Sequence, residues 1–333
     1  MRNEERIVCA KWETYIIKNI KDYIEFVISL NSQIEINSND YIPTKFTIPR
    51  SDDFANYYWE YYEDGSEKDQ YYYRGVSKSE YPLLPSIFRH SAKNIEYQLY
   101  HEIISRCHED FKELNSVEKL VNMQHYNCYT RLLDITSNPL VALYFACKSY
   151  SAKHDENRVG AVYIFAFSKN EIHYSDSARI QMLAHLAKMN DEEKKKILRS
   201  SLFNLKHSKD SFSINNNDGT YENDCIEKLY LDICNDIKAF KREIVPFDLL
   251  APLLLIPPKT NDRIKKQDGA FIISGLSENN KVAEAKLRML TKYKLLIHNV
   301  DKILEDLNYL GINESTLFPE IDNVAKFLVD SIS

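Results

Sequence analysis

Glycine is the residue that most restricts this fold, because the chain has only seven glycines among its 333 residues. That is about 2% of the chain, against roughly 7% in average proteins. The phosphate-binding loops of P-loop and GxGxxG folds depend on glycine, so neither type of nucleotide fold is expected. Three of the seven, Gly75, Gly160 and Gly269, lie at or beside strand-like segments.

The composition is that of a folded globular protein. Apolar residues make up 44% of the chain and charged residues 28%, which is enough for a full core. The length fits one large domain, or one domain with additions. The formal charge of −6, from 43 basic and 49 acidic residues, argues against a basic surface over the whole molecule. A local basic cleft remains compatible with it.

The cysteines and the hydropathy favour a cytoplasmic protein with free thiols. The six cysteines form no CxxC pair and none is paired with histidine at zinc spacing, so no metal site is predicted. The first fifteen residues are charged and contain no apolar signal segment. No apolar run approaches the ~20 residues of a membrane span. We therefore expect cytoplasmic localisation and no membrane partner.

The order of helix-like and strand-like segments predicts an α+β fold with a mixed, mostly antiparallel sheet and flanking helices. Regular alternation of strands and helices is missing, which argues against a doubly wound parallel sheet. Strands are expected at 70–76, 160–167, within 246–258, within 261–274, and at 292–300. Helices are expected at 11–32, within 92–122, after Asn138-Pro139, at 301–310 before Gly311, and near 319–331.

The first polar cluster is Arg74-Gly75, at the end of the aromatic strand 70–76. An arginine fork can hold a phosphate or a carboxylate through two parallel hydrogen bonds. The glycine lets a ligand or another stretch of backbone approach closely. A surface arginine followed by a turn glycine is the alternative interpretation.

The second cluster is the segment 130–136, in which apolar and hydrogen-bonding side chains alternate. If Asp134 is buried it needs a partner, because an unpaired buried charge is costly. Arg131, Arg74 and backbone N–H groups are the candidates. Asp134 could equally cap the helix that starts after Asn138.

His125 and a third cluster complete the polar residues of interest. His125 could act as a base or contact a nucleotide, although a lone histidine is more often structural. Arg263 and Gln267 lie four residues apart, just before the strand that Gly269 opens. The Gln267 amide can orient a ribose hydroxyl or a water, but it cannot act as a general base. A simple turn leading into the strand is the alternative.

Together these clusters resemble the FRG domain family, which is named for its aromatic-Arg-Gly motif. The matching positions are Tyr73-Arg74-Gly75, Gln124-His125-Tyr126, Thr130 to Asp134, Asn138-Pro139, Ala142 to Ala146, Arg263-x-x-x-Gln267-x-Gly269-x-Phe271, Leu310 to Asn313 and Leu317 to Pro319. Two positions depart from the family pattern: Asn127 stands where glycine is usual, and Ile135 where tryptophan is usual.

The resemblance implies a division of the chain into two regions. Residues 67–331 are expected to form the FRG domain, with a polar helical insertion at about 169–243. Residues 1–66 are expected to form a helical and acidic extension. The lysine-rich run within 191–197 is interpreted as the solvated face of a helix, and 51–70 as a solvated acidic loop or short helix.

The order of the motifs is also similar, more weakly, to the ADP-ribosyltransferase fold, which implies NAD as a substrate. In that comparison Arg74 holds the pyrophosphate and Thr130 supports the nicotinamide pocket. Gln267 takes the place of the usual late glutamate. If a carboxylate is required there, it comes from Asp134, Asp268 or Glu243. The implied catalytic residues are Arg74, Gln267 and Asp134. The implied NAD-binding residues are Tyr73, Arg74, Gly75, His125, Thr130 and Arg131.

The resemblance thus favours an NAD-dependent ADP-ribosyltransferase that modifies RNA, DNA or protein, as a bacterial toxin or anti-phage effector. An antitoxin or chaperone partner is then expected, with the insertion and the C-terminal helix as its contact surfaces. The alternative is a non-catalytic module that binds a nucleotide or nucleic acid through Arg74, Arg131 and Arg263. A nuclease that uses His125 with Asp134 is the third interpretation, although no metal cluster supports it.

Overall fold

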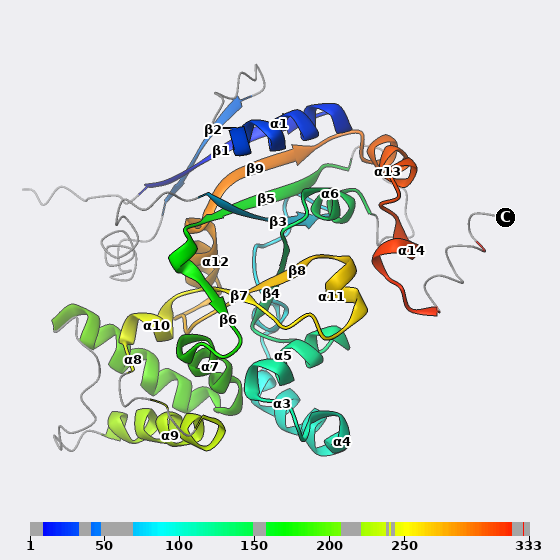
Figure 1. The fold of residues 1–333 in the computed structure, drawn as a ribbon. Helices are drawn as coiled ribbons and strands as arrows, with labels where there is room; N and C mark the ends of the chain where they lie inside the picture. Colours follow the sequence, from blue (N-terminus) through cyan, green and yellow to red (C-terminus); the bar gives the residue numbers. More distant parts are fainter. Residues whose placement is uncertain are drawn as a thin grey trace, which may run out of the picture.

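The computed structural model describes residues 9–32, 41–47, 69–148, 158–207, 221–237, 240, 244–321 and 329. Its centre is a nine-stranded sheet with the strand order β2-β1-β9-β5-β3-β4-β8-β7-β6 (Figure 1). Six of the eight neighbouring strand pairs are antiparallel and two are parallel. The predicted α+β class with a mixed, mostly antiparallel sheet is therefore confirmed.

The strands are β1 (Cys9–Ile17), β2 (Tyr41–Thr47), β3 (Gln70–Val76), β4 (Leu132–Thr136), β5 (Gly160–Phe167), β6 (Ile172–Tyr174), β7 (Leu253–Ile256), β8 (Gly269–Ile273) and β9 (Thr291–Ile297). The α-helices are α1 (Ile20–Ser32), α3 (Ile95–Arg106), α4 (His108–Phe111), α5 (Ser116–His125), α6 (Pro139–Cys147), α7 (Ala178–His185), α8 (Asp191–His207), α9 (Tyr221–Asp236), α10 (Pro246–Leu250), α11 (Asp262–Lys266), α12 (Asn280–Met289), α13 (Val300–Tyr309) and α14 (Glu314–Leu317). The 3₁₀ helices are η1 (Ser86–Arg89), η2 (Lys169–Glu171) and η3 (Leu186–Lys188).

The N-terminal segment corrects one prediction. Residues 11–32 were expected to form a single helix, but the chain is extended up to Ile17 and α1 begins at Ile20. Aromatic and β-branched side chains fill the end of β1 and favour a strand. The decisive interaction is long-range, because residues 13–17 pair in parallel with residues 293–297 of β9.

Apolar side chains cover both faces of the sheet. On β5, Val162 and Ile164 belong to one core with α1, α6 and α13. Tyr163 and Phe165, which point to the other face, belong to a second core with α5, α7, α8 and α9. The two faces follow from the alternation of side chains along a strand, and burial on both sides explains why β5 is continuously apolar.

The segment expected to be a helical insertion is largely helical, and it also supplies a strand. Figure 1 shows α7, α8, α9 and α10 gathered at the end of the sheet where β6 and β7 lie. β6 pairs in parallel with β7, and buried side chains of α7, α8 and α9 share the core beneath the sheet. The acidic segment 51–68, Glu243 and most of the expected C-terminal helix lie outside the described residues.

Helix α6 packs closely on strands β3 and β5 of the sheet. A Cβ atom added to Gly75 would lie 1.8 Å from the backbone oxygen of Ala142, and one added to Gly160 would lie 2.3 Å from that of Ala146. Both glycines are therefore required by the approach of helix to strand. Asn138 caps α6 by accepting from the backbone N–H of Leu140, over 3.0 Å.

Among the described residues, no helix is long and apolar enough to cross a membrane.

Candidate functional site

A cavity of about 520 Å³ opens where β3, β4 and β8 meet the ends of α5, α6 and α11. The three polar clusters predicted from the sequence all contribute to its wall, although Arg74 and Gln267 are 193 residues apart in the chain. The predicted site residues that line it are Tyr73, Arg74, Gly75, His125, Asp134 and Gln267. The sheet brings them together because β4 lies between β3 and β8.

Arg74 and Asp134 form the charged centre of this pocket. The Nη1 atom of Arg74 donates a hydrogen bond to the backbone oxygen of Asp134 over 2.6 Å and lies 3.7 Å from its carboxylate Oδ2. The Asp134 side chain is 60% exposed and that of Arg74 15%. Of the predicted partners of Asp134, Arg74 is thus the one that reaches it, and the cap of α6 is Asn138 instead.

A chain of hydrogen bonds orients the Asp134 carboxylate. The Thr130 hydroxyl accepts from the backbone N–H of Leu132 over 3.1 Å and donates to Gln124 Oε1 over 2.5 Å. Because the amide oxygen of Gln124 accepts from Thr130, its NH₂ group faces Asp134, and Nε2 donates to Oδ2 over 3.0 Å. Thr130 is fully buried, so it reaches the pocket only through Gln124.

The wall of the pocket is positively charged. Its charged residues are Arg74, Arg89, Arg263 and Asp134, which gives 3 − 1 = +2 with histidine neutral. Arg89 is held in place by hydrogen bonds from Nε and Nη2 to the Leu84 carbonyl oxygen, over 3.1 and 2.7 Å. Fixed guanidinium groups around a cavity favour an anionic ligand such as a phosphate.

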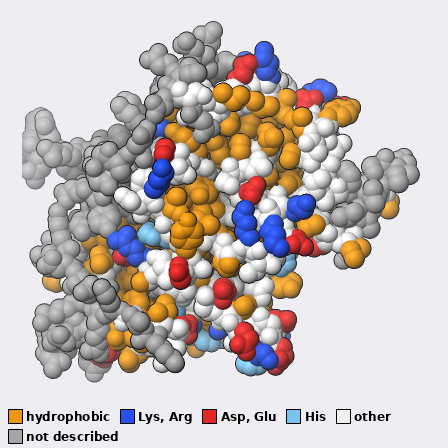
Figure 2. Space-filling view, viewed as in Figure 1, with side chains coloured by type: hydrophobic (Ala, Val, Ile, Leu, Met, Phe, Trp, Pro, Cys, Tyr) orange, Lys and Arg blue, Asp and Glu red, His pale blue; other side chains and the backbone are white. Residues whose placement is uncertain are grey.

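The positive charge continues onto α11 at the edge of the pocket. Figure 2 shows lysine and arginine side chains gathered around this helix, whose basic residues are Arg263, Lys265 and Lys266. The Arg263 guanidinium carbon lies 4.9 Å from the centre of the Phe318 ring. This cation–π contact orients Arg263 at the wall.

Aromatic side chains supply the apolar part of the wall. Tyr73 is almost fully buried, and burial raises the pKa of its phenol to about 12, so it remains a hydrogen-bond donor at neutral pH. Phe145 and Phe271 line the pocket beside it. Tyr129 also lines the wall and is 40% exposed.

The remaining predicted residues differ in their availability to a ligand. The Nδ1 atom of His125 is buried without a hydrogen-bond partner in the described part of the chain. Gln267 lines the pocket, but its Nε2 donates to the Leu317 carbonyl oxygen over 3.1 Å. Asp268 does not line the pocket, and its carboxylate pairs with Lys259 at 3.0 Å. Asp134 is therefore the carboxylate that the wall presents.

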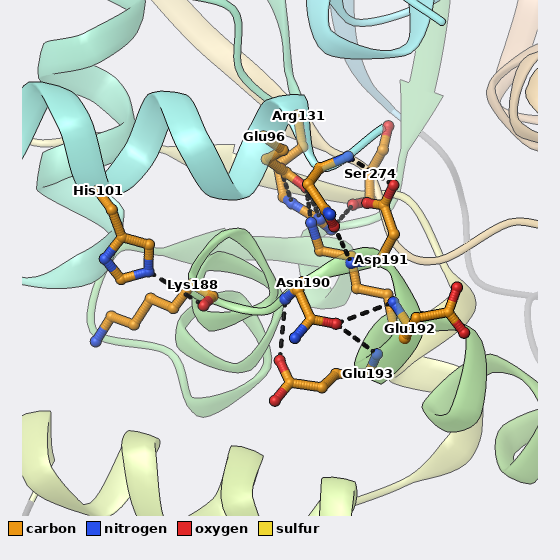
Figure 3. A network of polar contacts seen from close by, with 11 residues as sticks. Glu96, His101, Arg131, Lys188, Asn190, Asp191, Glu192, Glu193 and Ser274 are labelled. Carbon is orange, nitrogen blue, oxygen red and sulfur yellow. Dashed lines mark hydrogen bonds and ion pairs between the residues drawn. The ribbon is translucent and has the colours of Figure 1, made fainter. Parts of the chain in front are cut away.

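Arg131 was predicted to bind a ligand, but its side chain is buried in the interior and does not line the pocket. Its side chain is 1% exposed and donates to both carboxylate oxygens of Glu96, over 2.7 and 2.6 Å, and to the Ser274 carbonyl oxygen (Figure 3). Lys194 of α8 also pairs with Glu96, at 2.6 Å. The lysine run within 191–197 was expected to be a solvated helix face, but the Lys194 side chain is only 11% exposed. That expectation is therefore wrong for Lys194.

Two opposing effects act on the pKa of Glu96. Burial alone would raise the pKa of the Glu96 carboxyl, but the charges and hydrogen bonds of Arg131 and Lys194 outweigh burial and lower it to about 2. The carboxylate is therefore ionised at neutral pH. This network joins α3, α8 and the residue before β4 in the interior, and none of its three charged residues lines the pocket.

Arg89, Tyr129 and Gln124 line the wall but were not identified as site residues from the sequence. Arg89 lies in a segment that looks like an ordinary loop, and Tyr129 in a stretch without motif spacing. Gln124 was noted in a motif but given no role. The family pattern around Gln124-His125-Tyr126 was the one signal that could have led to it.

Residues 69–155 match the family model described as FRG domain. This span contains Arg74, Gln124, His125 and Asp134, so the predicted family resemblance is confirmed over this part of the chain. No curated protein and no solved structure matches the chain. The ADP-ribosyltransferase-like core therefore stays a prediction.

Proposed function

We propose, from the FRG-domain match and the arginine-lined pocket, that this protein binds NAD and transfers its ADP-ribosyl group to a macromolecule. The observation that carries the proposal is the Arg74–Asp134 pair, set in a positively charged and partly aromatic cavity. Its volume of about 520 Å³ lies within the ~300–1,000 Å³ typical of ligand pockets.

In this proposal the positive and negative groups of the wall contact different parts of NAD. Arg74, with Arg89 and Arg263, binds the pyrophosphate through charge-assisted hydrogen bonds. Apolar aromatic side chains surround the nicotinamide riboside portion and exclude water. Asp134 is held by Gln124 and remains exposed to the pocket, so its carboxylate can face the ribose.

The proposed reaction is a substitution at C1′ of the nicotinamide ribose. The bond from C1′ to the nicotinamide nitrogen breaks and nicotinamide leaves with the electron pair. A nucleophilic atom of the acceptor forms the new bond to C1′, and its proton passes to Asp134 and then to solvent. The transition state resembles an oxocarbenium ion, so a nearby carboxylate stabilises its positive charge.

The acceptor in this proposal is RNA, DNA or protein. Modification of such an acceptor suits a toxin or anti-phage effector, with an antitoxin or chaperone as its partner. The basic residues of α11 at the edge of the pocket would favour an acidic acceptor.

A specific observation favours a second candidate, nucleotide binding without chemistry. The Asp134 carboxylate is already engaged by Arg74 and Gln124, and the Gln267 amide is engaged by the Leu317 backbone. A site whose polar groups are satisfied in this way can bind a nucleotide and leave it intact. This second candidate no longer includes Arg131, which is buried.

Incubation with radiolabelled NAD tests the proposal. The purified protein is mixed with labelled NAD and separate pools of RNA, DNA and protein, and both label transfer and free nicotinamide are measured. Arg74→Ala is compared with Arg106→Ala, a matched surface arginine whose side chain is 78% exposed on α3.

We expect wild type and Arg106→Ala to label one pool, and Arg74→Ala to lose at least 100-fold of this activity. Equal labelling by Arg74→Ala would refute the site. NAD that binds and remains intact would establish the second candidate instead. Absence of any NAD binding by the folded wild type would overturn the transferase.

A further inference from the structure

Two exposed aromatic side chains, one just after η1 and one in the loop after α5, form a pair at the wall of the pocket. Tyr129 lines the cavity and His90 stacks on it, with ring centres 4.0 Å apart and an angle of 20° between the planes. Tyr129 is 40% exposed even though it lines a cavity. An exposed aromatic surface inside a pocket is a common mark of ligand contact.

Hydrogen bonds fix the backbone next to the two rings. The N–H of Thr130 donates to the Ser86 hydroxyl over 3.1 Å, and the N–H of Ile87 donates to the Thr130 carbonyl oxygen over 3.2 Å. These bonds tie the residue after Tyr129 to the 3₁₀ helix that leads to His90. A ligand that stacks on a ring attached to a fixed backbone loses less free energy to ordering.

A fixed cation lies next to this pair in the chain. Arg89 immediately precedes His90, lines the same cavity, and is held by two hydrogen bonds to Leu84. The wall therefore presents a flat aromatic surface and a guanidinium group together. A planar ring stacks on the first and a phosphate pairs with the second, and nucleotides carry both groups.

We infer that the Tyr129–His90 pair is the subsite that stacks on the heteroaromatic ring of the bound nucleotide, with Arg89 facing its phosphates. The inference deepens the proposed function and rests on it, because it assigns one end of NAD to this wall. Adenine and nicotinamide rings share the required chemistry. Mononucleotides that carry one ring each distinguish between them.

Binding calorimetry with unreactive fragments tests the subsite. Wild type, Tyr129→Ala and Tyr129→Phe are titrated with ADP, with nicotinamide mononucleotide and with inorganic pyrophosphate. We expect Tyr129→Ala to weaken binding of one mononucleotide about 5- to 150-fold and Tyr129→Phe to retain it, because stacking requires only the ring. Binding of pyrophosphate should change less than twofold in either variant.

The control is Tyr309→Ala, since Tyr309 is 77% exposed on α13 and does not line the pocket. Unchanged affinity of Tyr129→Ala for both mononucleotides would overturn the subsite while the proposed function stands. An equal loss for pyrophosphate and the mononucleotides would also overturn it, because the effect would not depend on a ring. If wild type binds neither mononucleotide, the proposed function fails as well.

Discussion

The Arg74 guanidinium is bound to the backbone of Asp134 more closely than to its carboxylate. The distance from Nη1 is 2.6 Å to the carbonyl oxygen and 3.7 Å to Oδ2. Because the backbone bond does not depend on the side chain, the charge of Asp134 can be removed without releasing the arginine. Anion binding and catalysis can therefore be separated at this position.

The variant Asp134→Asn should bind anions better and catalyse worse. Removing one negative charge about 4 Å from a guanidinium in a solvated pocket should tighten pyrophosphate binding by roughly two- to tenfold. The carboxylate that would steady the oxocarbenium-like state is lost, so label transfer should fall about 100-fold or more. Calorimetry and the NAD assay measure the two effects. Tighter binding with unchanged turnover would show that Asp134 is not catalytic.

The variant Gln124→Leu should destabilise the fold, because Gln124 joins two polar groups. It accepts from the buried Thr130 hydroxyl and donates to Asp134. Loss of the acceptor leaves the hydroxyl unsatisfied, so the free energy of unfolding should fall by about 1–3 kcal/mol. Urea denaturation measures this. A free energy of unfolding equal to that of wild type would contradict the hydrogen-bond chain.

The sequence singled out two charged residues that line the pocket. Arg74 was noted for its place beside a glycine near the end of a strand, and Asp134 because an aspartate among apolar residues needs a partner if it is buried. Arg131 carries the same local signal but lies in the interior. Its partner is Glu96, 35 residues earlier, and no local pattern shows that α3 would bring this carboxylate to it.

The fold was predictable to a similar extent. The strand 70–76 was expected and found, because its run of tyrosines suits a pleated, half-buried strand. The segment 11–17 was expected to be helical because apolar residues recur there at helical spacing. Pairing with β9, about 280 residues later in the chain, overrides that local preference.

Substitution of Gly75 by alanine should disrupt the fold, whereas the same change at Gly269 should not. A Cβ atom at position 75 would lie 1.8 Å from the Ala142 backbone oxygen, so α6 would have to move. The nearest atom to a Cβ at position 269 is 3.6 Å away, in Ile264. We expect a loss of about 3 kcal/mol or more for Gly75→Ala and under about 0.5 kcal/mol for Gly269→Ala in thermal denaturation. Equal losses would contradict the packing of α6.

Stability should fall in acid as Glu96 becomes protonated. Its folded-state pKa, about 2, lies below the ordinary value, so the stabilisation is complete above about pH 4.5 and is lost as the pH falls toward 2. At pH 7, Glu96→Gln should cost about 3–5 kcal/mol because Arg131 is left buried without a counter-charge. The control is Glu102→Gln, which removes the exposed ion pair with Arg106 and should lower the free energy of unfolding by under about 1 kcal/mol. A similar cost for both variants would contradict the buried ion pair.

The pH dependence of stability due to Asp248 should have the opposite sign to that due to Glu96 and occur at higher pH. Burial raises the pKa of its carboxyl to about 6, although Arg179, 3.0 Å away, lowers it in part. Because the folded-state pKa lies above the ordinary value, the folded protein binds the extra proton between about pH 4 and 6. The stability contribution of Asp248 is therefore present at low pH and is lost as the pH rises through this window, by about 1–3 kcal/mol. Urea denaturation across pH 4–7 measures this loss.

Asp248→Asn should remove this part of the pH dependence, because the amide has no proton to lose. Asp262→Asn, at an aspartate 74% exposed on α11, should leave the profile as in wild type. Since Glu96 acts mainly below pH 4.5 and Asp248 mainly above pH 4, the two slopes have opposite signs in largely separate windows. The contrary result would be a free energy of unfolding that changes between pH 4 and 6 in the same way for wild type and Asp248→Asn. It would show that the Asp248 carboxyl stays ionised throughout this range, held by Arg179.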